Sequence, residues 1–292
     1  MAKDKKKKKS NTDEHYYVVQ NLNLFTTTSC NFACEHCMRG EPTNEDLSDY
    51  TISKAFRRVI QIDNLNLNGG EVFLKPDILE KIIDTIIEKR IHVHCLSITT
   101  NGTLYTEEIK RILDKFYSYA SIYGGFISLR LSLDQYHNKQ LEQVFERSPQ
   151  LYYRYKDNIF NLLDSPYFND YNELGNIVNE GRAVNLNVEG KIVSKPYPHY
   201  CYLDTDTQYK DSSVLYIGGA IGIDVRGNVC ETAGIMLAPK ERCYGNLRTE
   251  SFTKIAERNF KFLPTFEMFS QVVSQAVMEN SIYYNPDANL RM

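Results

Sequence analysis

The sequence has no tryptophan, and no apolar run in it approaches the roughly 18 residues that a membrane-spanning helix needs. Its first residues are charged and are not followed by the apolar segment of a secretory signal. We therefore expect no membrane segment and a reducing, cytoplasmic location. In that setting the seven cysteines favour metal or redox chemistry over disulfides. The 292 residues, 42% hydrophobic and 24% charged, are typical of a globular chain of one or two domains.

Charge is distributed unevenly along the chain. Residues 1–9 contain six lysines and one aspartate, which gives this end a charge of +5 and leaves −8 on the remainder. Such a lysine run is typical of a solvated, disordered tail, and we expect residues 1–14 to form one. A basic tail can also attract nucleic acid. The acidic body argues against an extended phosphate-binding surface, so nucleic acid is not the expected partner.

Strand and helix patterns alternate after this tail, which favours an α/β fold with a parallel sheet. Between Asn138 and Asn185 a Tyr-rich helical pattern leaves any fifth and sixth strands undivided. The whole predicts an incomplete parallel (β/α)6 barrel. The expected strands are Tyr17–Thr28, Leu65–Asn68, Val93–Thr99 and Phe126–Leu133, and the expected helices are Ser48–Ile62, Pro76–Lys89 and Thr106–Phe116, the last with a threonine cap.

The pattern changes after Lys191, where a small module of a β-hairpin plus a helix is expected. Two strands flank Val225-Arg226-Gly227 as in a hairpin, and an amphipathic last helix is expected to pack against the barrel. We expect a tail (1–14), a partial barrel (15–190), the small module (191–260) and a C-terminal helix (261–292). The elements predicted here are strands Leu215–Asp224 and Asn228–Glu231 and helices Thr249–Arg258, with a threonine cap, and Pro264–Glu279.

Cys30, Cys34 and Cys37 follow the first predicted strand at the spacing CxxxCxxC. Three thiolates from one loop can hold three irons of a cubic cluster, which leaves the fourth iron without a protein ligand. A zinc site or an electron-transfer cluster is the alternative, but zinc normally takes four protein ligands, and no fourth cysteine or paired histidine lies nearby. The spacing therefore predicts a [4Fe–4S] cluster with an open iron.

The run Cys-Asn-Phe-x-Cys-x-His-Cys, with His36 before the third cysteine, resembles the motif of the radical S-adenosylmethionine (SAM) superfamily. The resemblance implies that the open iron chelates the amino and carboxylate groups of SAM. An electron then cleaves the sulfonium, and the 5′-deoxyadenosyl radical takes hydrogen from a substrate. It implies an electron donor such as flavodoxin or ferredoxin, metal-binding and catalytic roles for the three cysteines, and a cofactor contact for His36.

A second motif, Asn68-Gly69-Gly70-Glu71, ends the second predicted strand. Glycines let a ligand approach the backbone closely. At this position the run resembles the Gly-Gly-Glu motif of the same superfamily, which implies that Gly69, Gly70 and Glu71 receive the amino group of SAM. Both motifs fall at the carboxyl ends of strands, where parallel barrels place their active sites.

Two further strand ends carry candidate cofactor residues. Ser132 and Asp134 lie two apart on the fourth strand, so both could reach the ribose hydroxyls or the carboxylate region of SAM. Asn101, after the third strand, is a candidate ligand and equally a turn residue. For His137 a helix-capping or supporting role is favoured over catalysis.

Glu180-Gly181-Arg182-Ala183 resembles a late barrel motif of several radical SAM enzymes. The resemblance implies that Arg182 lies near the cofactor carboxylate, which a guanidinium can bind with two parallel hydrogen bonds. A structural salt bridge is the alternative for this arginine.

Cys201, Cys230 and Cys243 bracket the predicted hairpin. The stretch from Ile223 to Cys230, followed by Tyr244-Gly245-Asn246-Leu247, resembles the auxiliary-cluster domains called SPASM and twitch. It implies one auxiliary [4Fe–4S] cluster on these three cysteines, left open or closed by a non-cysteine side chain or by Cys95. The later closely spaced cysteines of a full SPASM domain are lacking, so a second auxiliary cluster is not expected. Buried thiols are the alternative.

The resemblance implies a radical SAM enzyme of the oxidoreductase kind that modifies a ribosomally made peptide or a small molecule by hydrogen abstraction. Crosslinking, epimerisation with Cys201 or another thiol as hydrogen donor, and two-electron dehydrogenation all stay open. Two alternatives come from other classes of protein. One is a nucleic-acid modifying enzyme that uses the lysine tail, and the other is a non-catalytic iron–sulfur regulatory protein.

Overall fold

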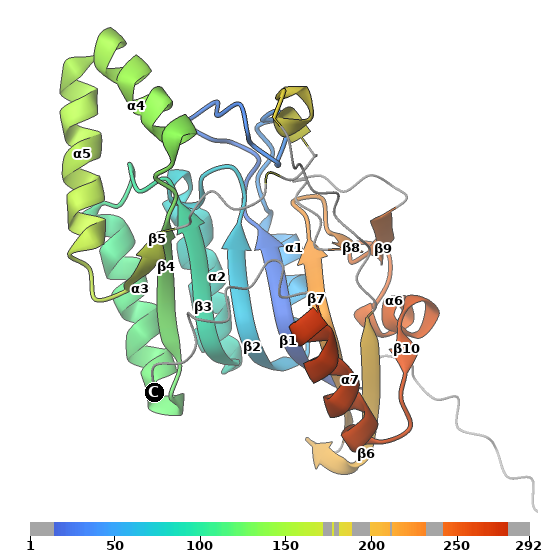
Figure 1. The fold of residues 1–292 in the computed structure, drawn as a ribbon. Helices are drawn as coiled ribbons and strands as arrows, with labels where there is room; N and C mark the ends of the chain where they lie inside the picture. The colour runs from blue at the N-terminus through green and yellow to red at the C-terminus, as the bar shows by residue number, and fades with distance from the viewer. Residues whose placement is uncertain are drawn as a thin grey trace, which may run out of the picture.

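The computed structural model describes residues 15–171, 177, 181–188, 199–210, 212–231 and 242–279 (Figure 1). The helices are α1 (Asp49–Ala55), α2 (Pro76–Lys89), α3 (Glu107–Ala120), α4 (Gln135–Arg147), α5 (Pro149–Leu163), α6 (Phe252–Asn259) and α7 (Phe266–Glu279), with short 3-10 turns at Val72–Leu74 (η1), Ser121–Tyr123 (η2) and Gly181–Asn185 (η3). The strands are β1 (Tyr16–Phe25), β2 (Val59–Asn68), β3 (His92–Thr100), β4 (Phe126–Leu131), β5 (Phe168–Tyr171), β6 (Tyr200–Tyr209), β7 (Ser212–Ile223), β8 (Asn228–Glu231), β9 (Cys243–Asn246) and β10 (Lys261–Phe262).

One mixed sheet, mostly parallel, organises the fold. Its strand order is β10-β6-β7-β1-β2-β3-β4-β5, and all pairs from β7 to β5 are parallel, whereas β6 runs antiparallel to β7. The path ends at β10 on one side and β5 on the other, so the sheet is open. This confirms the predicted α/β class and the incomplete barrel. Because the strands are parallel, the loops after β1, β2, β3 and β4 all leave from the same edge, here called the carboxyl edge.

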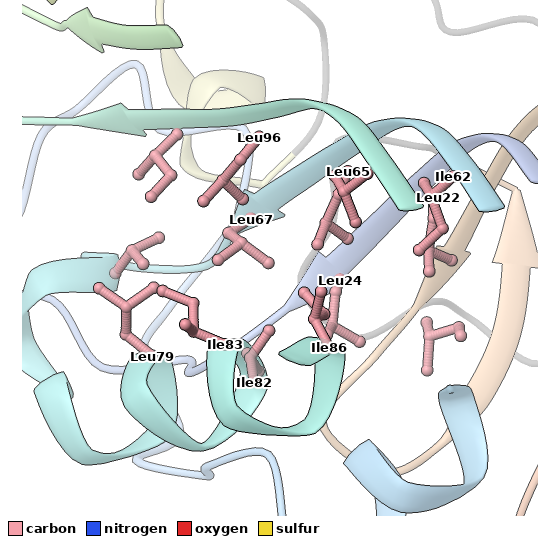
Figure 2. Close-up of a cluster of buried hydrophobic side chains, with 14 of the residues drawn as sticks. Leu22, Leu24, Ile62, Leu65, Leu67, Leu79, Ile82, Ile83, Ile86 and Leu96 are labelled. Atoms are coloured by element: carbon pink, nitrogen blue, oxygen red, sulfur yellow. The ribbon is translucent and has the colours of Figure 1, made fainter. Parts of the chain in front are cut away.

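Helix α2 buries its apolar stripe against the first three strands (Figure 2). Each fully buried Leu or Ile contributes about 1.5–3 kcal/mol of transfer free energy, so this layer fixes β1, β2 and β3 relative to one another. The predicted bounds of this helix, Pro76–Lys89, are confirmed. The packed side chains include Leu79, Ile82, Ile83 and Ile86 from α2 and Leu22, Leu24, Ile62, Leu65, Leu67 and Leu96 from the strands, all fully buried or nearly so.

The predicted helix Ser48–Ile62 is wrong in its second half. Helix α1 ends at Ala55, Arg58 adopts a left-handed φ of 61°, and β2 already begins at Val59. Residues 59–62 are apolar at positions that suit either a helix or a strand. Pairing with β1 and β3 decides the outcome, since tertiary contacts override local propensity.

The segment from Asn138 to Asn185 contains most of α4, then α5, β5 and the 3-10 turn η3, apart from the residues that are not described. Pro149 begins α5 and separates it from α4. The threonine cap predicted for the helix Thr249–Arg258 is also wrong. Helix α6 begins at Phe252, and its cap is Ser251, whose Oγ accepts a hydrogen bond from the Lys254 amide. Strand β6 was not among the predicted elements.

The predicted hairpin around Val225-Arg226-Gly227 is confirmed by antiparallel pairing of Ile223 with Val229 and Gly222 with Cys230. Its first strand, β7, lies in the main sheet beside β1. Helix α7 packs through Phe269 and Val273 near Gly218 of β7. The division of the chain after residues 14, 190 and 260 stays a prediction. Among the described helices, none is both long enough and apolar enough to cross a bilayer.

Candidate functional site

The three-cysteine loop begins where β1 ends, at the carboxyl edge of the sheet. Cys34 is buried, Cys30 and Cys37 are partly exposed, and none of them forms a disulfide. The Cys37 amide donates to the Cys34 carbonyl at 3.2 Å, and the Phe32 amide donates to the Cys30 Sγ at 3.4 Å. The turn thus gathers three sulfurs on one short loop, as the spacing predicts.

The surroundings of this loop raise the pKa of two of its thiols, so a metal would have to displace their protons. Burial, then the nearby Glu71 carboxylate, raises the pKa of Cys30 to about 12. Burial, with contributions from Cys30 and Cys37, raises the pKa of Cys34 to about 12. These thiols therefore keep their protons at neutral pH unless a cation binds and displaces them. Three neighbouring thiols with no disulfide fit three irons of a cubic cluster.

The Gly-Gly-Glu segment runs beside the start of this loop. The Gly70 amide donates to the Thr27 carbonyl at 2.8 Å, and the Glu71 amide donates to the Ser29 carbonyl at 2.9 Å. A Cβ on Gly70 would lie 2.0 Å from the Ser29 oxygen, and one on Gly69 would lie 2.6 Å from the Thr27 oxygen. Both positions therefore need glycine, because the two backbones are in direct contact.

Glu71 is the most buried charged group of the site, with 1% of its surface exposed. Its carboxylate accepts hydrogen bonds from the Thr100 hydroxyl (2.7 Å) and from the amides of Asn101 (2.9 Å) and Phe73 (3.1 Å). Burial raises its pKa, and the three donors act in the opposite direction. The carboxylate thus ties the end of β2 to the end of β3. A direct contact between Glu71 and SAM stays a prediction.

Asn101 connects the third strand end to the cysteine loop. Its Nδ2 donates to Asn31 Oδ1 at 2.9 Å, and Asn31 Nδ2 donates to the Thr103 hydroxyl at 2.8 Å. The Thr103 hydroxyl in turn donates to Asn101 Oδ1 at 2.6 Å. Asn31 stands between two loop residues, Cys30 and Phe32, so this amide ring fixes the loop from the side. Asn31 and Thr103 were not among the predicted site residues, although Asn31 lies inside the cysteine motif.

Asp134 caps α4 and holds two histidines. Its Oδ1 accepts from the amides of Tyr136 (2.8 Å) and His137 (3.1 Å), and its Oδ2 lies 2.8 Å from His137 Nδ1 and 3.4 Å from His36 Nε2. Burial acts to raise the pKa of Asp134, but the hydrogen bonds from His137 and the charge of His36 lower it to about 2. The cap of α4 is thus Asp134 and not His137, and a supporting role of His137 in the site stays a prediction.

His36 is placed by its neighbours on both sides. Its ring stacks on Tyr136, with centroids 4.5 Å apart and planes at 22°, and its Nδ1 is buried without a hydrogen-bond partner. Ligand atoms of His36, Asp134 and His137 lie within 4.8 Å of one another, so the trio could also hold a divalent cation. The hydrogen bond between His137 and Asp134 already explains the closest pair. Ser132, also buried, donates its amide to the Thr100 carbonyl at 2.8 Å and so joins β4 to β3.

Arg182 lies beside the cysteine loop although it is about 145 residues away from it in the sequence. Its amide donates to the Cys37 carbonyl at 2.9 Å, and a Cβ on Gly181 would lie 2.6 Å from that same oxygen. Its Nη1 lies 3.5 Å from the exposed Glu41 carboxylate, while its Nε is buried without a partner. The side chain is only 15% exposed, so a largely buried positive charge stands beside the thiols. Glu180, the first residue of this predicted motif, lies outside the described residues.

Of the three cysteines predicted to hold an auxiliary cluster, Cys230 and Cys243 lie together and Cys201 lies apart from them. Cys230 on β8 and Cys243 on β9 are direct cross-strand partners. Cys201, fully buried on β6, is opposite Ile217 of β7, whereas Cys230 is opposite Gly222 of the same strand. Five positions along a strand correspond to roughly 17 Å. The structure therefore brings Cys230 to Cys243 but does not bring Cys201 to either.

Cys95 lies away from every cluster candidate. It is a buried residue of β3 that pairs with Asn64 and Phe126. It lies three residues after the start of the strand and five before its carboxyl end at Thr100. Burial raises its pKa to about 11. It packs as a small apolar side chain in the strand layer.

Replacing Asp134 with Asn is expected to weaken SAM binding by about tenfold, because an amide cannot accept from both histidines and cap α4 as well. The cluster absorbance should stay, since the three thiols are untouched. Isothermal titration of SAM into the reconstituted protein measures the loss. The control is Asp114→Asn, which removes a carboxylate that accepts from Tyr167 at 2.7 Å on α3. Equal SAM affinity in both variants would remove Asp134 from the cofactor site.

The fold and these contacts define a class: an open parallel α/β domain that gathers three free thiols at the carboxyl edge of its sheet, inside a scaffold of buried hydrogen bonds. Residues 24–166 match the family model described as the radical SAM superfamily. This segment of the chain is therefore similar to radical SAM domains, and the matched residues include the three cysteines, Gly69 to Glu71 and Asp134.

The curated relatives at this level of similarity are GTP 3′,8-cyclases. A probable GTP 3′,8-cyclase of Pyrococcus abyssi (strain GE5 / Orsay) is 32% identical over 134 residues, which is 43% of this chain and 38% of the relative. The GTP 3′,8-cyclase of Sulfurovum sp. (strain NBC37-1) is 26% identical over 142 residues, 46% of this chain and 40% of the relative. The chain thus matches about 40% of the length of the curated relatives.

Two solved structures are also similar. One is described as native anSMEcpe with bound AdoMet and Cp18Cys peptide; it is 13% identical with a TM-score of 0.48, over 82% of this chain and 80% of that one. The other is Streptococcus suis SuiB bound to precursor peptide SuiA, at 11% identity and a TM-score of 0.37, over 84% of this chain and 65% of that one.

Proposed function

We propose that this protein is an enzyme that holds a [4Fe–4S] cluster on Cys30, Cys34 and Cys37, binds SAM at that cluster and cleaves it reductively. The observation that carries the proposal is the gathering of three free thiols on one loop inside the matched radical SAM domain. When bound, the cluster supplies an electron that splits SAM into methionine and a 5′-deoxyadenosyl radical, and this radical takes a hydrogen atom from the substrate. The remaining residues of the site bind and orient.

Three contacts hold the loop in position for this task. Gly69 and Gly70 press against its first residues, the amide ring of Asn31, Asn101 and Thr103 holds its side, and the Arg182 amide holds the Cys37 carbonyl. We propose that the SAM molecule lies over this loop, near the carboxyl ends of β2, β3 and β4. Glu71, Asn101 and Ser132 fix the backbone there, and Arg182 supplies positive charge for the carboxylate of SAM.

His36 and His137 lie beside the proposed position of SAM. His36 is stacked on Tyr136 and lies against Asp134, so its ring cannot swing freely. We propose that this fixed ring bounds the SAM pocket, and that Asp134 acts by positioning it. The low pKa of Asp134 keeps the carboxylate charged at every pH at which the enzyme works.

We propose a peptide or small-molecule substrate for the hydrogen abstraction. The curated relatives are named after a nucleotide, GTP, which supports a small-molecule substrate. The peptide side rests on the SPASM and twitch resemblance of the hairpin sequence. An electron donor such as flavodoxin or ferredoxin would supply the reducing electron, and seven cysteines that form no disulfide suit a reducing, cytoplasmic location.

The first test is spectroscopic. The protein reconstituted under anaerobic conditions should hold about four irons on this loop, as expected for one [4Fe–4S] cluster. Addition of SAM to the dithionite-reduced protein should change the electron paramagnetic resonance signal, because an open iron gains new ligands. A signal that SAM leaves unchanged would mean a closed cluster, as in an electron-transfer or regulatory protein.

We also propose an auxiliary cluster that uses Cys230 and Cys243, the cross-strand pair of the hairpin module. Reconstituted parent protein is then expected to hold about eight irons, and the Cys230→Ala/Cys243→Ala variant about four. Because the strand register separates Cys201 from this pair, Cys201→Ala should keep about eight irons and serves as the matched control. Equal iron in the parent and the double variant would show that these cysteines are buried thiols.

A further inference from the structure

A cavity lies far from the cysteine loop, between α1, the start of β1 and α6. Its volume is about 240 Å³, and its wall carries five cationic side chains and a single carboxylate, Glu250. Tyr17 of β1 also lines it, whereas the cysteine loop follows the other end of that strand, at Phe25. Tyr17 and Phe25 lie eight positions apart along the strand, which is roughly 26 Å. The cationic residues are Lys54, Arg57, Arg58, Arg248 and Lys254.

Most of the positive charge of this cavity has no carboxylate partner among the lining residues. Within the ranges that the structure describes, none of the five cations forms an ion pair with a carboxylate, and Glu250 is already paired with Arg258 at 2.9 Å, outside the lining. Five like charges gathered at a concave surface focus a positive potential there and favour an anionic ligand.

Two of the arginines are held in place by uncharged partners. The Arg248 guanidinium donates to the Thr51 hydroxyl at 3.2 and 3.3 Å and to the Val225 carbonyl at 3.2 Å. Arg58 lies over the ring of Tyr16 at 5.3 Å, and its Nη1 is buried without a hydrogen-bond partner. These contacts fix the guanidinium groups but leave their charge free to act on a ligand, which lowers the entropy lost on binding.

The positive electrostatic field of the five cations also reaches residues near the cavity. Lys89 has a lowered pKa, caused first by burial and next by the Arg57 guanidinium. Helix α6 begins at the cavity, so the positive end of its dipole adds to the same sign of charge. A phosphate group is the anion that arginine and lysine together recognise best, and several phosphates on one molecule match several cations.

We propose that this cavity binds a small molecule carrying two or more phosphate groups, at a site separate from the radical site. The cavity is too small for a nucleic acid strand, and the acidic body of the chain outside residues 1–9 disfavours a long phosphate backbone. The aromatic pair of Tyr17 and Phe252, with centroids 5.6 Å apart, forms part of the wall and offers an apolar surface beside the phosphates.

The test is isothermal titration of tripolyphosphate into the full chain, reconstituted under anaerobic conditions. Arg57→Glu/Lys254→Glu reverses two exposed cations of the cavity, and Lys110→Glu/Lys261→Glu reverses two exposed lysines elsewhere with the same change of net charge. The first variant is expected to weaken binding at least about tenfold, and the second by less than about twofold. The Cys30→Ala protein should bind as the parent does, so this result is independent of the proposed radical chemistry.

Two ligand arms identify the source of the phosphates. Tighter binding of ATP than of tripolyphosphate would identify a nucleotide, whereas equal or weaker binding would identify a free polyphosphate; both support the site. Three results would overturn it: no binding of either ligand to the parent, equal weakening in the two double variants, or binding of an RNA oligonucleotide alone.

Discussion

Replacement of Cys30, Cys34 or Cys37 with alanine is expected to abolish the cleavage of SAM. Each substitution removes one thiolate of a three-ligand set, and the loop has no fourth cysteine thiol to take its place within the part of the chain that is described. The iron bound at this loop should fall, and 5′-deoxyadenosine should drop to the background level of the assay. Chromatography of reaction mixtures under dithionite measures the product, and a colorimetric assay measures the iron.

The matched control for this series is Cys95→Ala. Its thiol is buried in β3, five residues before the carboxyl edge, and contacts strand neighbours in place of the loop. This variant should keep the iron content and the 5′-deoxyadenosine yield of the parent protein. If the three loop variants and the control all kept the parental yield, the cysteine loop would not be the site of cleavage.

Replacement of Gly70 with alanine is expected to be nearly as damaging, although glycine carries no chemical group of its own. The new Cβ would lie 2.0 Å from the Ser29 oxygen and 3.0 Å from the Cys30 nitrogen, so the backbone of the cysteine loop has to move. Overpacking of this kind costs typically about 1–3 kcal/mol, and here the strain falls on the atoms that place the first thiol. We expect at least about a tenfold loss of 5′-deoxyadenosine formation.

A glycine without neighbours provides the comparison. A Cβ on Gly124 would meet no atom within 4 Å, although its φ of 74° makes alanine unfavourable there. Gly124→Ala should therefore lower the melting temperature slightly and leave the iron content unchanged, since this turn lies between η2 and β4 at the opposite edge of the sheet. A Gly70→Ala protein with parental activity would show that the contact between the Gly-Gly-Glu segment and the loop is not required.

The pH dependence of stability offers a further check on Asp134. Its folded-state pKa of about 2 lies below the ordinary value of 3.8, so the carboxylate stabilises the fold above pH 3.8 and this contribution disappears as the pH falls towards 2. The free energy of unfolding in urea should differ most between the parent protein and Asp134→Asn above pH 4. The two values should converge near pH 2. A difference in unfolding free energy that stays constant from pH 2 to above pH 4 would contradict a stabilising role for the contacts between Asp134 and the two histidines.

Features that depend on residues close together in the chain could be predicted from the sequence. The cysteine spacing indicated three thiols on one loop, and the helix over Pro76–Lys89 was visible from its apolar stripe because both depend on residues close in the chain. The helix over Ser48–Ile62 was partly wrong because residues 59–62 owe their strand form to partners 31 to 43 residues away in the sequence.

The long-range contacts of the site could not be predicted in the same way. Asn31 meets Asn101 across 70 residues, and Arg182 meets Cys37 across more than 140, so no local pattern records either contact. The auxiliary cysteines show the same limit, because their order along the chain does not reveal that β7 holds Cys201 and Cys230 at separate register positions. Spacing predicts ligands within one loop far better than ligands from separate strands.

The most direct test of the account is SAM cleavage by the reconstituted parent protein. Incubation with SAM and dithionite in the absence of oxygen should yield 5′-deoxyadenosine and methionine in equal amounts, and the Cys30→Ala/Cys34→Ala/Cys37→Ala protein should yield neither above background. A parent protein that holds its full complement of iron and still leaves SAM intact would contradict the proposed function.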